Sequence, residues 1–252
     1  MGPLWRIGGL YRRQEVTRTR GDTVGDVTRP SATDDDIDEY DDELEVDPDP
    51  DLLEPPSQAW RVRTAIEMVI SGALGLLASF VLSIEALALA ADPGASLGCD
   101  FNAVISCSVV AQSPQAELFG FPNAFLGIAA EAVVITVAMA VLGGVRFPRW
   151  FMLGAQAIYT LGFLFAWWLF FEAFFVIKAL CPWCLLITVT TTLVWAGLTR
   201  LNVREGVITF PGRWGPAARR FVDHGNDWFV TIALIVLLAV AILVKYGSII
   251  LA

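Results

Sequence analysis

The chain has 252 residues, of which 56% are hydrophobic and 17% are charged, and its mean hydropathy is +0.60. A single soluble core cannot bury so large an apolar fraction, so the composition favours a membrane protein. The formal net charge of -9 argues against nucleic acid as a partner, and most of the acidic residues fall in the first quarter of the chain.

Residues 1–58 are predicted to form a disordered acidic tail. Their segment TRPSATDDDIDEYDDELEVDPDPDLLEPP is rich in Asp, Glu and Pro and poor in aromatic residues. Such a segment buries too little apolar surface to offset the entropy lost on ordering. It holds no long apolar run of the kind found in a secretory signal, so we expect the amino terminus to stay in the cytoplasm.

Residues 59–252 are predicted to form one transmembrane domain. It contains five apolar stretches, at about residues 64–90, 124–145, 150–177, 182–200 and 228–251. Each is close to or above the roughly 20 residues that a helix needs to cross the hydrocarbon core. Lipid offers the backbone no hydrogen-bond partner, so the stretches must be helices. The predicted fold class is an all-α polytopic membrane helical bundle.

The positions of arginine predict how this bundle is oriented. Arginine flanks the apolar stretches at Arg61, Arg63, Arg146, Arg149, Arg200, Arg204, Arg213, Arg219 and Arg220. The positive-inside rule places these segments in the cytoplasm. Alternation then places the loop 91–123, the junction before residue 182 and the carboxyl terminus outside an inner, or plasma, membrane. Only Lys178 and Lys245 bring positive charge to that side.

All four cysteines fall on the predicted outer side. Cys99 and Cys107 lie in the loop 91–123, and Cys181 and Cys184 form a CPWC motif where the fourth helix begins. Disulfides persist outside the cytoplasm, which favours disulfide chemistry. A structural zinc site would usually have two CxxC-type pairs, whereas the loop pair is eight residues apart. No metal site is predicted.

The CPWC motif is better suited to thiol exchange than to bracing the fold. A CxxC disulfide closes a very small ring and constrains the unfolded chain little. Pro182 fits the first turn of a helix, which places Cys181 near the N-cap and Cys184 deeper in the membrane. The positive end of the helix dipole stabilises a thiolate, the species that attacks a disulfide or a quinone.

Taken in order, these motifs resemble the vitamin K epoxide reductase family. CDFNAVISCSVVAQS, FPNAFLG and CPWC match the family's loop cysteine pair, nearby Ser or Thr, Asn entering the second helix, and late CxxC. The resemblance covers about Thr64 to Arg200, and the fifth helix is similar to that of bacterial members. It implies a four-helix core with a fifth transmembrane helix, and a quinone-dependent thiol oxidase that generates disulfides.

The resemblance also implies an electron path. Cys181 and Cys184 would form the active-site disulfide, with Cys184 meeting a membrane quinone, menaquinone or ubiquinone. Cys107 would exchange with Cys181, and Cys99 would receive electrons from an extracytoplasmic thioredoxin-fold, DsbA-like dithiol protein. Because no thioredoxin-like domain follows the fifth helix in this sequence, we expect that donor to be a separate protein.

The resemblance also implies that two further residues bind the quinone or support the site. Asn123 resembles the family's Asn that hydrogen-bonds a quinone oxygen, and it could also cap the second helix. Ser113 resembles the supporting Ser or Thr, and its alternative is to cap a short helix that begins at Pro114. Where animal members carry a Tyr near the quinone, this chain has Thr188.

Carboxyl groups inside or at the ends of the predicted helices occur at Glu85, Glu131 and Glu172. Intramembrane carboxyls are candidates for function. We expect these three to be solvated or satisfied structurally, outside the site.

Two other functions stay open. The same site could reduce vitamin K epoxide or quinone with electrons from external thiols. The chain could instead be a non-enzymatic membrane scaffold whose disulfides brace an external loop. A second class of bacterial quinone-linked thiol oxidases, built as a four-helix bundle, also uses two periplasmic cysteine pairs. That class fits less well, because its CxxC-type pair comes first in the chain.

Overall fold

The protein is described by a computed structural model that covers residues 56–212 and 214–250. The predicted acidic tail lies outside the described residues, apart from its last three positions. Within these ranges the secondary structure is helical, and the one β contact is an isolated parallel bridge between Ile105 and Leu180.

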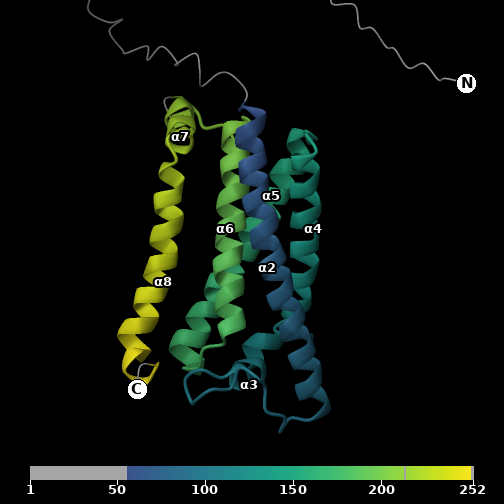
Figure 1. The fold of residues 1–252 in the computed structure, drawn as a ribbon, viewed down its shortest axis with the longest axis vertical. Helices are drawn as coiled ribbons and strands as arrows, with labels where there is room; N and C mark the ends of the chain where they lie inside the picture. The colour runs from purple at the N-terminus through teal and green to yellow at the C-terminus, as the bar shows by residue number, and fades with distance from the viewer. Residues whose placement is uncertain (1–55, 213, 251–252) are drawn as a thin grey trace, which may run out of the picture. The chain divides into compact units, whose positions relative to one another are not determined.

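Five long helices make up the bundle (Figure 1). They are α2 (Gln58–Ala91), α4 (Ala124–Leu142), α5 (Arg149–Phe171), α6 (Pro182–Arg204) and α8 (Asn226–Ile250). A π-helical segment, η2 (Glu172–Ile177), continues α5. Each of the five is long and apolar enough to cross a membrane. The predicted all-α, polytopic membrane bundle is therefore confirmed.

Local side-chain chemistry explains where the helices begin. Ser57 Oγ accepts a hydrogen bond from the Trp60 backbone N–H at 3.3 Å and caps α2. Pro148 precedes α5, and Pro182 opens α6 at a position where its missing N–H breaks no helical hydrogen bond.

Helix α2 is central to the packing, since it lies against both α4 and α6, while α5 packs on α6. Small residues bring these helices close together. A Cβ atom on Gly127 of α4 would lie 2.3 Å from Ser79 Oγ of α2, and one on Gly197 of α6 would lie 2.9 Å from Met68 Cγ. Many large apolar side chains stay exposed on the outer faces, where lipid would cover them.

Buried ion pairs join the helices at the end of the bundle that holds the start of α2 and the end of α6. Arg61 Nε lies 2.6 Å from Glu205 Oε1. Arg200 pairs with Glu67 of α2 at 2.7 Å and with Asp227 of α8. We call this the arginine end. A short helix, α7 (Trp214–Asp223), follows α6 and precedes α8 in the chain, and it is not predicted from the sequence.

The opposite end carries the connection between α2 and α4 (Figure 1). This connection contains α3 (Cys107–Ala111) and a 3₁₀ helix, η1 (Pro114–Glu117). The Ser106 N–H donates to the Leu180 carbonyl at 3.0 Å, and the Leu180 N–H donates to the Val104 carbonyl at 2.7 Å. These two bonds bring Cys107 and Cys181, which directly follow Ser106 and Leu180, to the same place.

Candidate functional site

The four cysteines form one cluster at this end of the bundle. Cys99 and Cys107 are joined by a disulfide, whereas Cys181 and Cys184 are free thiols. The sulfurs of Cys99, Cys107 and Cys181 pack together in a buried group, with Cys184 against it. The loop pair and the CPWC pair are therefore neighbours in space.

The shortest contact between the two pairs joins Cys181 Sγ to Cys107 Sγ at 3.3 Å. Thiol–disulfide exchange proceeds by thiolate attack on one disulfide sulfur through a mixed disulfide. Cys181 and Cys107 are thus placed to form that mixed disulfide with little movement of the backbone.

Cys181 is at the N-cap position of α6, and its sulfur accepts a hydrogen bond from the Cys184 backbone N–H at 3.4 Å. The Cys184 thiol also donates to it and, with the backbone N–H groups of Cys184 and Trp183, lowers the pKa of Cys181, although burial opposes this shift. These hydrogen bonds therefore favour the thiolate form of Cys181.

Asp100 shapes the loop between the two disulfide-bonded cysteines. Its carboxylate accepts hydrogen bonds from the Ser106 hydroxyl at 2.8 Å and from the backbone N–H groups of Leu97 and Ser108 at 2.9 and 3.0 Å. Desolvation favours the neutral acid, but these bonds outweigh it and lower the pKa of Asp100 to about 2. The carboxylate thus stays charged, and holds the loop, at any pH near neutral.

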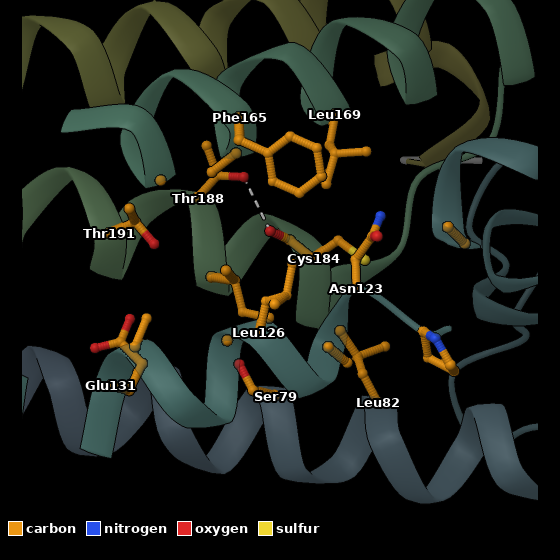
Figure 2. Close-up of a pocket in the computed structure, with 18 of the residues that line it drawn as sticks. Ser79, Leu82, Asn123, Leu126, Glu131, Phe165, Leu169, Cys184, Thr188 and Thr191 are labelled. Carbon is orange, nitrogen blue, oxygen red and sulfur yellow. Dashed lines mark hydrogen bonds between the residues drawn. The ribbon is translucent and has the colours of Figure 1, made fainter. Parts of the chain in front are cut away.

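A cavity of about 820 Å³ opens beside the CPWC pair and is lined by residues of α2, α4, α5 and α6. Figure 2 shows Cys184 and Asn123 facing this space, with apolar side chains such as Leu126, Phe165 and Leu169 around them. An apolar cavity of this size with a few polar groups is typical of a small-molecule site.

A family model described as the vitamin K epoxide reductase family matches residues 66–198, which is more than half of the chain. The chain belongs to the vitamin K epoxide reductase family. It is accordingly a membrane thiol–disulfide oxidoreductase. Members of the family are generally quinone-linked and act with thioredoxin-like proteins. A search of curated proteins found no match to the sequence.

The two polar residues that the resemblance connects with quinone both line the cavity. Asn123 Nδ2 donates to the Gln115 carbonyl at 2.7 Å, and its buried Oδ1 has no hydrogen-bond partner among the described residues. Ser113 Oγ donates to the Val110 carbonyl at 2.6 Å. Ser113 and Asn123 do occupy the N-cap positions of η1 and α4, but neither side chain makes a capping hydrogen bond there.

Thr188, at the position where animal members of the family carry a Tyr, is buried and also lines the cavity. Its hydroxyl donates to the Cys184 carbonyl at 3.0 Å, as the dashed line in Figure 2 marks. That hydroxyl proton is thus directed to the helix backbone.

Two cavity residues, Glu131 and Ser79, are not among the site residues predicted from the sequence. Glu131 Oε1 accepts a hydrogen bond from the Tyr159 hydroxyl at 3.1 Å, while Glu131 Oε2 and Ser79 Oγ are buried without a partner among the described residues. Asn123, Gly127 and Glu131 are four residues apart, so they follow one another along one face of α4. That spacing is a signal in the sequence, whereas Ser79 comes from another helix and gives none.

Proposed function

We propose that the chain is a quinone-dependent thiol oxidase that generates disulfides in extracytoplasmic proteins. Electrons would pass from a DsbA-like dithiol protein to the Cys99–Cys107 pair, then to the Cys181–Cys184 pair, and then to a membrane quinone. The observation that carries the proposal is the 3.3 Å contact between Cys181 Sγ and Cys107 Sγ. It joins the two redox pairs in the order that this path requires.

The exchange begins when a partner thiolate attacks Cys99 and releases Cys107, and the partner's second cysteine then frees Cys99. The Cys107 thiolate attacks Cys181 in the Cys181–Cys184 disulfide and expels Cys184. Cys99 next attacks Cys107, which restores the loop disulfide and expels Cys181 as a thiolate. The described state, with the loop pair oxidised and the CPWC pair reduced, corresponds to the product of this sequence.

The cavity beside Cys184 has the properties that a quinone site needs. It is largely apolar, it is large enough for a ring with part of a prenyl chain, and its polar atom Asn123 Oδ1 is buried without a partner among the described residues. A quinone bound there would accept two electrons and two protons as the Cys181–Cys184 dithiol closes to a disulfide. Asn123 would hold a quinone oxygen, Ser113 would support that position, and the apolar walls would exclude water.

The proposed orientation places the cysteine end outside the plasma membrane and the arginine end in the cytoplasm. Arg61 and Arg200 lie at the arginine end, which agrees with the positive-inside rule. Cys99 has only 5% of its surface exposed, so the dithiol protein must displace part of the loop to reach it. Phe101, two residues later, is 71% exposed and offers an apolar contact for such a partner.

The test is oxidation of a reduced DsbA-type protein by the purified chain with a water-soluble quinone analogue, following quinone absorbance. We expect turnover by the wild type and none by Cys184→Ser. Cys99→Ser should lose activity with the protein thiol but keep it with a small dithiol. Thr136→Ala, on an exposed face of α4, is the matched control and should behave as wild type.

Two results would favour the other functions. If the wild type reduces no quinone while its cysteines stay oxidised, the disulfides are structural and the scaffold alternative holds. If it fails with quinone but consumes vitamin K epoxide when a dithiol is supplied, the site runs in the reductive direction.

A further inference from the structure

A carboxyl group contacts the loop disulfide. Glu85, near the end of α2, places Oε1 at 3.3 Å and Oε2 at 3.6 Å from Cys99 Sγ. A carboxyl oxygen of Glu85 and the sulfurs of Cys99 and Cys107 all lie within 4.8 Å of one another. From the sequence, Glu85 is expected to be a solvated residue near the outer end of the helix, and it takes no part in the proposed electron path.

We propose that Glu85 is a catalytic residue, the general base that takes the proton of the Cys99 thiol when Cys99 closes the loop disulfide. The inference rests on the proposed function, because it assigns one proton within that exchange. The same carboxyl would return the proton to Cys99 when the loop disulfide is opened by the partner.

The step balances in atoms and electrons. Before it, Cys107 and Cys181 share a mixed disulfide, Cys99 is a thiol and Glu85 is a carboxylate. The Cys99 proton moves to Glu85, the Cys99 sulfur forms a bond to Cys107, and the Cys107–Cys181 bond breaks with its electron pair on Cys181. Cys99 is oxidised, Cys181 is reduced and leaves as a thiolate, and Glu85 becomes a neutral acid.

The atoms lie in the order that this step needs. The contacts run from Glu85 Oε1 to Cys99 Sγ at 3.3 Å, through the disulfide to Cys107 Sγ, and on to Cys181 Sγ at 3.3 Å. The base and the leaving sulfur are therefore at opposite ends of the bond that forms. The Cys184 backbone N–H donates a hydrogen bond to Cys181 Sγ and so stabilises the negative charge that forms there.

A structural role for Glu85 explains the contact less well. Among the described residues, Cys99 is the only one that makes a hydrogen-bond contact with this carboxyl. A disulfide sulfur has no proton to donate and is a weak acceptor. A hydrogen bond in the described state therefore needs the proton on Glu85, which is the product of the proposed step.

The charged and titratable groups around Glu85 also bear on its action. Asp100 faces it from the loop, and Cys181 and Cys184 face it from the start of α6. A carboxylate at Glu85 would repel the thiolate that forms on Cys181, whereas the neutral acid does not. Proton transfer to Glu85 thus removes a negative charge from the cluster as Cys181 acquires one.

The test compares Glu85→Gln with Glu172→Gln, a carboxyl at the same end of the bundle that accepts a hydrogen bond from Gln115 Nε2 at 3.2 Å. Turnover with the DsbA-type protein is measured from pH 6 to about pH 9, the range over which a free thiol goes from mostly protonated to mostly ionised. Acid-quenched samples are alkylated and digested, and the Cys107–Cys181 peptide pair is quantified by mass spectrometry.

We expect Glu85→Gln to lower turnover near pH 6 by about 10²-fold or more, as loss of a general base does. Activity should return as the pH approaches about 8.5, where a free cysteine ionises unaided. The Cys107–Cys181 disulfide should accumulate, while Glu172→Gln follows the wild type. If Glu85→Gln folds poorly, Glu85→Asp decides, because a shorter acid should keep the wild-type pH profile with a reduced rate.

Wild-type rates and no accumulated mixed disulfide in Glu85→Gln would overturn the inference, and so would a Glu85→Asp variant whose turnover falls near pH 6 as steeply as that expected of Glu85→Gln. Failure of the proposed function gives a different result, because the wild type itself would then reduce no quinone.

Discussion

The contact between α2 and α4 beside the cavity can be tested with one methyl group. Gly127→Ala would place its Cβ 2.3 Å from Ser79 Oγ and 3.1 Å from Ser79 Cβ. Rotating the Ser79 hydroxyl relieves the first contact but not the second, so the helices must move apart. Overpacking of this kind costs about 1–3 kcal/mol, against a gain of roughly 0.5–1 kcal/mol from replacing glycine in a helix.

The net loss for Gly127→Ala is therefore up to about 2.5 kcal/mol, or a fall in Tm of up to roughly 10 °C for a chain of this size. The assay is thermal unfolding in detergent, with Gly154→Ala as the matched control. Among the described residues, no heavy atom beyond the neighbouring backbone of α5 lies within 4 Å of a Cβ at Gly154, so that variant should be equal to wild type or slightly more stable. If both variants melt together at or above the wild-type Tm, the close approach of α2 and α4 is refuted.

Three further outcomes are expected. Arg200→Gln leaves Glu67 and Asp227 buried without their cation, so thermal unfolding should show a loss of about 3–5 kcal/mol; an unchanged Tm contradicts the ion-pair network. Asp100 has its pKa lowered to about 2, so its stabilisation of the loop is complete above its unfolded value and lost as pH falls toward 2. Hydrogen exchange of residues 97–108 should therefore be constant from pH 7 to pH 5 after correction for intrinsic rates, and Asp100→Asn should speed it throughout. Asn123→Ala should raise the KM for quinone by up to about tenfold, the equivalent of one hydrogen bond, with kcat changed less; an unchanged KM removes Asn123 from the quinone site.

The sequence predicts the helices well where a single local pattern decides them. Lipid forces every long apolar stretch into a helix, and Pro182 places Cys181 at an N-cap, as the structure has it. Helix α7 escapes prediction because it is short, polar and outside the apolar stretches. The length of a helix beyond its apolar core also depends on caps and ion pairs, as Ser57 and Arg61 show at the start of α2.

The site is predictable only in part, because much of it depends on contacts between distant segments. The family motif names the cysteines and Asn123 in advance, but the resting pairing of the cysteines is not in the sequence. Glu85 meets Cys99, which lies 14 positions further along the chain beyond the end of α2, and Ser79 meets Gly127 across two helices. Neither contact has a periodicity or a spacing that a single sequence reveals.

The bridge between Ile105 and Leu180 has a consequence for selectivity. Its hydrogen bonds use backbone atoms only, so side-chain changes at these positions leave the tether intact, whereas proline at Ser106 or at Leu180 removes one of its two donors. The tether holds Cys107 beside Cys181. Their reaction therefore has an effective molarity far above the concentration of any dissolved thiol. A dissolved small thiol would then compete poorly with Cys107 for attack on the Cys181–Cys184 disulfide. The surrounding thiol pool would therefore reduce that disulfide slowly, while the loop pair reduces it rapidly.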